Sequence, residues 1–323
     1  MKHKRNLFAI LFGLMLFLFT SYVLADTFLI PRTYTVVPDD TETATANLPE
    51  TAAPASVEMM AEASTAIAAP ATPESAATEP IQTETSYGDG NILVALSTYR
   101  LLDTAVYVAD VRLSSPEYLR TAFAASTYGR NVTEKTSSIA SSVNAILAIN
   151  GDYYGAQRSG YVIRNGVLYR SQSSGGEDLV IYADCSFGIV SENEVTAESL
   201  LESGAWNVLS FGPALVQDGA VSVSENDEVG RAMASNPRTA IGVVDDLHYL
   251  FVVSDGRTGD SDGLSLYELA TFLQSLGVET AYNLDGGGSS SMVFLGNVIN
   301  NPVNGRRSSE RSVSDIVYIG YSA

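Results

Sequence analysis

The chain reads Asn283-Leu284-Asp285-Gly286-Gly287-Gly288-Ser289-Ser290-Ser291 between two apolar segments, residues 278–282 and 292–295. An amide and a carboxylate therefore lie at the end of a predicted strand, followed by glycines and hydroxyls. Each glycine loses much backbone entropy on folding, so a run of them indicates that the backbone approaches something closely. Backbone N–H groups and hydroxyls around one acid suit a polar, anionic ligand. These residues alone fit a tight turn closed by an Asx motif equally well.

The segment before this loop predicts a helix. Residues 266–276 carry an apolar face at helical spacing, and Ser265 and Glu268 have the spacing of a capping box. The helix connects a predicted strand ending at Asp255 to the strand ending at Asp285, which is a βαβ-like unit. If the two strands are parallel neighbours, both aspartates lie at one edge of the sheet, where ligands collect in open sheets.

Most other segments alternate apolar and polar residues or are rich in β-branched residues, and turn dipeptides separate them. We expect an α+β fold: a hairpin-rich mixed β-sheet domain with few helices. Hairpin turns are predicted at Asn165-Gly166, Asp218-Gly219, Asp245-Asp246 and Gly296-Asn297, a first strand pair at 91–97 and 106–113, a closing strand at 314–321, and a second helix at 134–147 with Thr133 as its N-cap.

Three regions are expected along the chain. Basic residues precede an uncharged apolar run at 6–25, which predicts that residues 1–25 are a signal peptide or a single membrane anchor. The basic end predicts export, so the protein would be secreted or held at the cell envelope, with the remainder of the chain outside. Residues 26–90 are acidic and rich in Ala, Thr and Pro, which is typical of a disordered linker. Residues 91–323 form the predicted functional domain.

Charge and composition exclude several classes of function. The formal net charge is −19, whereas nucleic-acid binding needs a basic surface. The single cysteine, Cys185, allows no intrachain disulfide and is predicted to be a buried, inert thiol. The domain has one histidine, His248, whose apolar strand favours a packed core residue over the base of a Ser-His-Asp triad. One cysteine and two histidines in the chain provide no zinc cluster. Carboxylates, arginines and backbone donors remain as the candidate chemical groups.

Four further polar clusters follow predicted strands or loops. Each could be an ordinary turn or solvated loop, and Asp255 to Gly263 resembles a calcium loop only weakly, because it lacks the distal glutamate of an EF-hand. Paired carboxylates suit glycosyl transfer, and arginines suit an anionic leaving group. The clusters are residues 148–155, 236–242, 255–263 and 306–311.

Taken in order, these motifs resemble the phosphodiester glycosidases, the family of N-acetylglucosamine-1-phosphodiester alpha-N-acetylglucosaminidase-like domains. Bacterial relatives are often called exopolysaccharide biosynthesis proteins. The resemblance covers about residues 142–321; Ser291 stands where threonine is more usual, and the cysteine-rich extension of animal members is absent. It rests on Ala148 to Tyr154, Phe211 to Val216, Asn236 to Gly242, Asp255 to Arg257, Asn283 to Ser290, Asn300 to Pro302, and Glu310-Arg311.

The resemblance implies hydrolysis of a glycosyl-phosphodiester bond in a cell-envelope glycan or a related sugar-1-phosphodiester. Asp285 and Asp152 would act as acid–base or nucleophilic groups, and Arg238 and Arg257 would hold the phosphate. No cofactor or metal ligand is assigned, although a divalent cation stays open. The candidate catalytic residues are Asp285, Asp152, Asp255 and Glu310, and the candidate substrate-binding residues are Asn150, Tyr153, Arg238, Arg257, Asn283, Gly286, Gly287, Gly288, Ser289, Ser290 and Arg311.

Two other functions remain open from the sequence. The same pocket could recognise a cell-wall polymer or exopolysaccharide without cleaving it, and the long linker fits this reading equally well. A metal-dependent phosphodiesterase would cut the other side of the phosphate. In every case the expected partner is an envelope glycan or a glycosyl-phosphodiester, with a membrane contact only through an uncleaved N-terminal segment.

Overall fold

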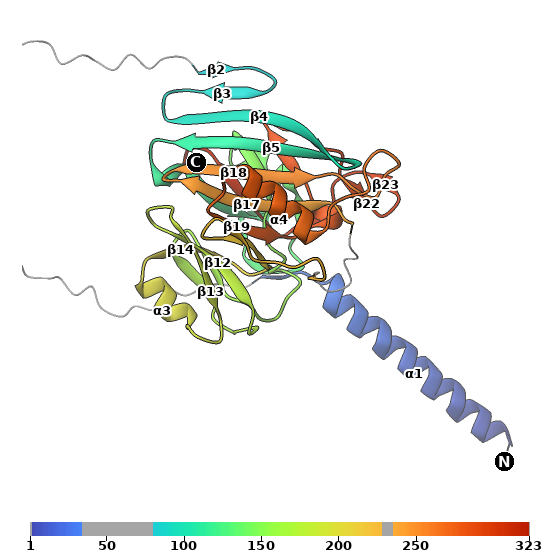
Figure 1. The fold of residues 1–323 in the computed structure, drawn as a ribbon. Coiled ribbons are helices and arrows are strands. Elements are labelled where there is room, and N and C mark those ends of the chain that lie inside the picture. Colours follow the sequence, from blue (N-terminus) through green and yellow to red (C-terminus); the bar gives the residue numbers. More distant parts are fainter. Residues whose placement is uncertain (1, 34–79, 228–234, 323) are drawn as a thin grey trace, which may run out of the picture. The chain divides into compact units, whose positions relative to one another are not determined.

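The computed structural model describes residues 2–33, 80–227 and 235–322. The described part is mostly β-sheet with four α-helices, as the α+β expectation requires (Figure 1). The predicted linker falls largely on residues 34–79, outside the described residues. Within the described part of the chain, no helix combines the length and apolar character needed to span a bilayer. The helices are α1 (Lys2–Phe28), α2 (Thr136–Ser142), α3 (Ala197–Glu202) and α4 (Leu266–Ser275).

A nine-stranded antiparallel sheet forms the largest layer. It includes two strands that precede Asn91, where the functional domain was predicted to begin. In spatial order it contains β16 (Ala220–Val221), β15 (Ala214–Gln217), β19 (Thr280–Leu284), β17 (Arg238–Asp245), β18 (His248–Ser254), β5 (Thr104–Leu113), β4 (Ile92–Leu101), β3 (Ser86–Gly88) and β2 (Ile81–Gln82).

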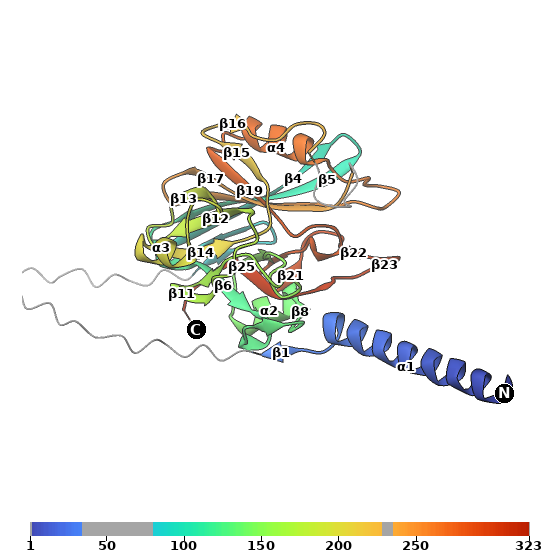
Figure 2. The ribbon, with the colours of Figure 1, turned by 90° about the horizontal axis from the view of Figure 1, so that it is seen from below.

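Two five-stranded antiparallel sheets lie on one side of this layer, and α4 lies on the other (Figure 2). One contains β11 (Val167–Arg170), β10 (Val162–Arg164), β14 (Ala205–Leu209), β12 (Glu177–Tyr182) and β13 (Phe187–Ser191). The other contains β21 (Asn297–Val298), β20 (Met292–Phe294), β9 (Leu147–Asn150), β25 (Asp315–Ile319) and β6 (Leu119–Phe123).

Short elements complete the fold. Three two-stranded sheets pair β1 (Arg32–Thr33) with β7 (Gly129–Arg130), β22 (Val303–Asn304) with β23 (Arg307–Ser308), and β24 (Ser312–Val313) with β8 (Glu134–Lys135). Three short 3-10 helices are η1 (Pro116–Tyr118), η2 (Ala124–Ser126) and η3 (Gly287–Ser289).

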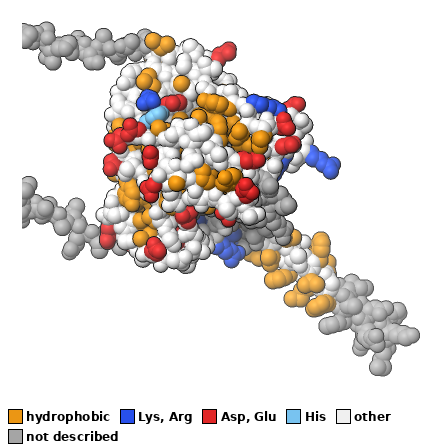
Figure 3. Space-filling model, viewed as in Figure 1, with side chains coloured by type: hydrophobic (Ala, Val, Ile, Leu, Met, Phe, Trp, Pro, Cys, Tyr) orange, Lys and Arg blue, Asp and Glu red, His pale blue; other side chains and the backbone are white. Residues whose placement is uncertain are grey.

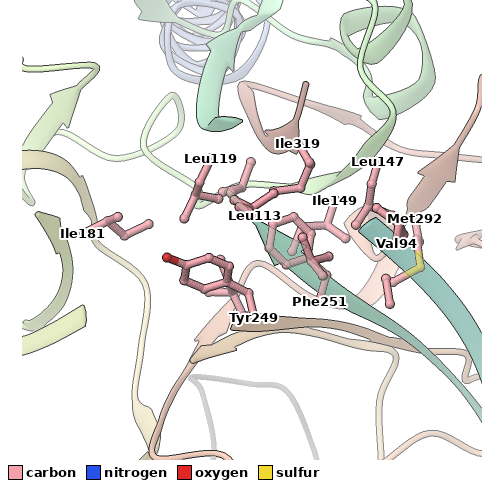
Figure 4. Packing of buried hydrophobic residues seen from close by; sticks show 14 of the residues in the cluster. Val94, Leu113, Leu119, Leu147, Ile149, Ile181, Tyr249, Phe251, Met292 and Ile319 are labelled. Carbon is pink, nitrogen blue, oxygen red and sulfur yellow. The ribbon is translucent and has the colours of Figure 1, made fainter. Parts of the chain in front are cut away.

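The main hydrophobic core lies where the three large sheets meet. Phe251 and Tyr249 of β18 face Leu147 and Ile149 of β9, and Ile181 of β12 closes one side (Figure 4). Each sheet also has a second buried face: α4 covers the nine-stranded sheet, α2 covers the sheet of β9, and α3 covers the sheet of β12. β18 is buried along its whole length because both faces of its sheet are covered. A strand buried on both faces has a nearly continuous run of apolar residues, as residues 249–253 do.

The capped helix and two hairpins are confirmed. The Ser265 hydroxyl accepts from the Glu268 N–H, and the Glu268 carboxylate accepts from the Ser265 N–H, as a capping box requires. Asn165-Gly166 and Asp218-Gly219 turn with positive φ at both residues, which is the geometry of a type I′ hairpin.

Three local predictions are corrected. The hairpin predicted at Gly296-Asn297 turns at Leu295-Gly296, and the one at Asp245-Asp246 turns one residue later. The helix predicted over 134–147 is only α2, and its N-cap is Lys135 rather than Thr133. Residues 134–135 pair with β24 instead, because the tertiary ladder outweighs the weak helix propensity of a serine-rich segment.

The two strands around α4 are not neighbours. β17 lies between β18 and β19 and is antiparallel to both, so β18 and β19 point the same way without pairing. Asp255 and Asp285 therefore do emerge at one edge of the sheet, as expected, with Arg238 at the start of β17 between them. This edge positions the candidate site.

Candidate active site

A pocket of about 310 Å³ opens at the edge where β19 ends and β17 begins. It combines three arginines, one carboxylate and two aromatic rings. Its lining residues are Tyr153, Gln157, Phe211, Asn236, Arg238, Arg257, Asn283, Leu284, Asp285, Gly286, Gly287 and Arg311.

The glycine run after Asp285 allows the loop to pack against the start of β17. A Cβ on Gly286 would lie 2.9 Å from the Pro237 carbonyl oxygen, closer than ordinary packing allows. The Gly287 N–H donates to that same oxygen at 2.8 Å, and Gly287 has a φ of +62°. The close approach expected from the sequence is therefore first of all an approach to another chain segment.

Asp285 is the only carboxylate among the described lining residues of this pocket. Its Oδ2 accepts hydrogen bonds from Ser289 Oγ at 2.6 Å and from an Arg311 terminal nitrogen at 2.7 Å. Burial raises the pKa of the Asp285 carboxyl, while the positive charge of Arg311 and the Ser289 hydrogen bond act in the opposite direction. The carboxylate is thus enclosed, oriented and paired with a cation.

The three arginines reach the pocket from three separate segments. Arg238 is buried at the start of β17, and its Nε donates to the Leu264 carbonyl at 2.8 Å. Arg257 lies against Gly287 and donates to Asn236 Oδ1 at 2.6 Å. Arg311 bonds Asp285, so all three arginines lie around the one carboxylate of the pocket. The face of the molecule shown in Figure 3, by contrast, displays many Asp and Glu side chains.

Tyr153 and Phe211 supply the aromatic part of the lining. Tyr153 is 40% exposed, so part of this residue is open to a ligand in the pocket. Phe211 is held by a hydrogen bond from its N–H to Tyr282 Oη at 3.0 Å. Such rings suit stacking against the apolar face of a sugar, and the tyrosine hydroxyl adds a polar contact.

The predicted site residues divide into two groups. Eight line the pocket, and the others lie outside its lining. Those that line it are Tyr153, Arg238, Arg257, Asn283, Asp285, Gly286, Gly287 and Arg311; those that do not are Asp152, Asp255, Glu310, Asn150, Gly288, Ser289 and Ser290.

Asp152 belongs to a buried ionic cluster. Its Oδ2 is 2.8 Å from a terminal nitrogen of Arg164, and the same nitrogen is 2.8 Å from Asp315 Oδ2. Burial, together with the charge of Asp152, raises the pKa of Asp315 to about 7, although Arg164 opposes the shift. Asp315, a charged residue in the otherwise apolar strand β25, was a sequence signal for a buried charge. Nothing in the local sequence singled out Arg164 as its partner.

Asp255 and Glu310 hold the chain around the pocket. Asp255 accepts from the Asn301 N–H at 2.8 Å and from Tyr107 Oη at 3.2 Å, which ties the segment after β21 to β5. Glu310 accepts from the Ser137 N–H at 2.9 Å at the start of α2, where a carboxylate is favoured by the helix dipole. Neither group contacts Asp285 in the described hydrogen bonds.

Asn150 and the serines support the glycine loop from behind. Asn150 is fully buried; its Nδ2 donates to the Asp285 carbonyl at 2.6 Å and its Oδ1 accepts from Thr239 Oγ1 at 2.8 Å. Ser289 bonds Asp285, while the buried Ser290 hydroxyl has no hydrogen-bond partner in the described structure. Asn150 thus joins β9, β17 and the loop.

Sequence reasoning missed four lining residues: Gln157, Phe211, Asn236 and Leu284. Phe211 and Asn236 lie in motifs that the sequence singled out, so their motif membership was an available signal. Gln157 had no comparable signal, because its position depends on the fold of residues 153–160. Across the described chain, no three His, Cys, Asp or Glu side chains converge as a metal-binding group.

A second acid cluster next to Asp152 gives a testable pH effect. Ser210 links the two: its N–H donates to Asp152 Oδ2 at 2.9 Å and its hydroxyl donates to Asp178 Oδ1 at 2.5 Å. Burial raises the pKa of Asp178 to about 8, against the Ser210 hydrogen bond, and the charge of Glu192 raises it further.

We expect Asp178→Asn to flatten the pH dependence of stability. The raised pKa means that the folded state holds more protons than the unfolded state, so stability falls as pH rises from 3.8 to about 8. Asparagine cannot ionise, and above that window the variant should be more stable by on the order of 1 kcal/mol or more. Urea unfolding across the pH range measures this; parallel curves for parent and variant would contradict it.

This chain is similar to known proteins in sequence and in fold. A model of the phosphodiester glycosidase family matches residues 143–320. The SPbeta prophage-derived protein YomE of Bacillus subtilis is 31% identical over 200 residues, 60% of this chain and 31% of that protein. The N-acetylglucosamine-1-phosphodiester alpha-N-acetylglucosaminidase of Mus musculus is 31% identical over 124 residues, 36% of this chain and 24% of the mouse enzyme. The chain thus spans less than a third of the length of these two relatives.

Two solved structures share the fold. The catalytic domain of zebrafish N-acetylglucosamine-1-phosphodiester alpha-N-acetylglucosaminidase, auto-inhibited by its pro-peptide, matches with a TM-score of 0.56 at 22% identity, covering 71% of this chain and 82% of that one. A hypothetical protein from Synechocystis matches with a TM-score of 0.55 at 16% identity, covering 71% and 62%. The residues that line the arginine-rich pocket all lie within the matched range. Since the family model matches more than half of the chain, this chain belongs to the phosphodiester glycosidase family.

Proposed function

We propose that this protein hydrolyses a glycosyl-phosphodiester bond in a cell-envelope glycan or a related sugar-1-phosphodiester. The observation that carries the proposal is the lining of the pocket, in which Arg238, Arg257 and Arg311 converge with Asp285 beside two aromatic rings. Guanidinium groups bind phosphate through forked, charge-assisted hydrogen bonds. The aromatic rings offer a stacking surface for the sugar.

The reaction breaks the bond between the anomeric carbon and the phosphate oxygen. Water supplies the hydroxyl of the free sugar and one proton, and a phosphomonoester leaves with the aglycone. A phosphate leaving group is a weak base, with a second pKa of about 6. The departing phosphate therefore needs its negative charge stabilised by arginine more than it needs a proton from a general acid. One carboxylate in the pocket is then enough for the reaction, as nucleophile or general base.

Asp285 takes the role of that carboxylate in our proposal, either attacking the anomeric carbon or activating water. Arg311 and Ser289 orient its Oδ2, as the 2.7 Å and 2.6 Å contacts allow. Asp152, Asp255 and Glu310, the other predicted catalytic acids, receive positioning roles, because their carboxylates bond neighbouring chain segments.

The site of cleavage can be read directly from the products. We expect the full chain, incubated with a panel of sugar-1-phosphodiesters in ¹⁸O-labelled water, to release free sugar that carries the label. Label in the phosphate, with sugar phosphate released, would identify a phosphodiesterase instead. Binding without any product would identify a recognition module. Repeating the assay with a strong chelator tests the divalent cation that the sequence left open.

We also propose that the enzyme works outside the cytoplasm, where envelope glycans lie. The basic residues Lys2, Lys4 and Arg5 before the uncharged run at 6–25 support export. Protease treatment of intact cells should degrade the domain, and N-terminal sequencing of the recovered protein distinguishes a cleaved signal from a retained anchor. Protection from protease in intact cells would overturn this localisation.

A further inference from the structure

A second pocket, which we call the acidic groove, adjoins the candidate active site. It has a volume of about 510 Å³ and is lined by Glu177, Phe211, Gly212, Pro213, Ser222, Val223, Asn226 and Asp227. Phe211 lines both cavities, so this residue is the wall that they share. A ligand that extends past Phe211 would reach from one cavity into the other.

The shared wall is fixed to the strand that carries the catalytic candidate. The Asn283 N–H donates to the Pro213 carbonyl at 3.1 Å, and Asn283 Nδ2 donates to the Gly212 carbonyl at 2.8 Å. Because Asn283 lies two residues before Asp285 on β19, the position of the groove relative to the carboxylate is set by the sheet.

The charge reverses across this wall. The active-site pocket has three arginines against one acid, whereas the described lining of the groove contains Glu177 and Asp227 and neither Lys nor Arg. Glu177 accepts from the Ala214 N–H at 2.9 Å, and Asp227 accepts from the Ser224 N–H at 2.6 Å. Both donors are neutral, so these hydrogen bonds hold the side chains without cancelling their charge.

We propose that the acidic groove is the aglycone subsite of the proposed phosphodiester glycosidase reaction and that it selects an aglycone with hydroxyl and ammonium groups. This inference rests on the proposed function. The phosphate lies among the arginines, and the alcohol it esterifies extends past Phe211 between Glu177 and Asp227. An ammonium group is attracted there, hydroxyls bond Asn226 and the two acids, and a second anionic group is repelled.

The test uses three phosphomonoesters of similar length as product probes for the full chain: ethyl phosphate, O-phosphoethanolamine and phosphoglycolate. In titration calorimetry at low salt, we expect O-phosphoethanolamine to bind about two- to fivefold more tightly than ethyl phosphate, and phosphoglycolate to bind more weakly by a similar factor. The preference should shrink as salt is added, since the groove is open to solvent.

Charge-neutralising variants locate the selectivity. Asp227→Asn and Glu177→Gln keep a hydrogen-bond acceptor but remove the charge. Each should move the ratio of the dissociation constants of ethyl phosphate and O-phosphoethanolamine toward one. Asp245→Asn is the matched control: Asp245 is exposed at the far end of β17, roughly 23 Å from Arg238 at about 3.3 Å per residue, and its variant should retain the preference.

Each outcome decides something different. Equal binding of the three probes, or a preference unchanged by Asp227→Asn and Glu177→Gln, overturns the aglycone subsite and leaves the proposed function standing. Selective binding without hydrolysis of any sugar-1-phosphodiester overturns the catalytic proposal and with it the aglycone subsite, and it leaves the groove as a cation-selective binding site. Failure of all three probes to bind overturns the subsite, while hydrolysis of the sugar-1-phosphodiester panel decides the proposed function separately.

Discussion

Asp285→Asn is expected to lower kcat for a sugar-1-phosphodiester by about a hundredfold to ten-thousandfold, the range typical for loss of a positioned acid or base. The amide retains an oxygen that can accept from Ser289 but can neither attack the anomeric carbon nor take a proton from water. The loss should appear mainly in kcat, because the arginines to which we assign phosphate binding remain. Steady-state release of free sugar measures the effect.

The matched control is Asp218→Asn, the same chemical change at an exposed hairpin turn whose positive φ suits asparagine. It should keep full activity. If Asp285→Asn folds normally and hydrolyses at the parental rate, Asp285 is not the reacting group. The pH profile gives a second check: since the ionised form reacts, the rate should fall as pH drops through the raised pKa of Asp285.

Arg164→Met should cost at least about 3–5 kcal/mol of stability, the largest folding effect we expect from a single substitution. Arg164 is 2% exposed and bonds both Asp152 and Asp315, so its removal leaves two buried carboxylates without a counter-charge. Burial alone would lower the pKa of Arg164, but the two carboxylates raise it above its usual value, which keeps the guanidinium charged. Urea unfolding near neutral pH measures the loss.

Arg112→Met is the matched control, because Arg112 pairs with Asp110 on the surface and its side chain is 60% exposed. An exposed pair of this kind contributes about 0–1 kcal/mol, so the variant should unfold close to the parent. If Arg164→Met does not fold, the triple variant Arg164→Met/Asp152→Asn/Asp315→Asn tests the same cluster without leaving a buried charge uncompensated. Similar small losses for Arg164→Met and Arg112→Met would contradict the account.

Local features of the fold were predictable because their causes lie within a few residues. The capping box of α4 depends on Ser265 and Glu268, and the type I′ turns depend on single Asn-Gly and Asp-Gly dipeptides. The helix predicted over 134–147 was wrong over half of its length for the opposite reason. Its first two residues pair with β24, and its last residue starts β9, which pairs with β20 and β25; all three partner strands lie far away in the chain.

The same distinction applies to the site. The motif around Asp285 identified the strand end and the glycine loop, and the order of the motifs identified most residues that line the pocket. The sequence could not show that Asp152 faces Arg164 rather than the pocket, because the ionic cluster is completed by Asp315, which also pairs with Arg164 and lies far along the chain from both. An acid in a motif can serve chemistry or structure, and only its neighbours decide which.

By itself, the sequence determined the hairpin-rich class, the family and the residue types available for chemistry, since these follow from local turn chemistry, periodicity and motif order. Only the tertiary structure decided which acids meet the pocket. β17 enters between β18 and β19 and carries Arg238 to the same edge as Asp285, while Arg164 draws Asp152 away into the interior. The physical reason is that burying a charge is costly unless it finds a partner, and such partners come from strands distant in the chain.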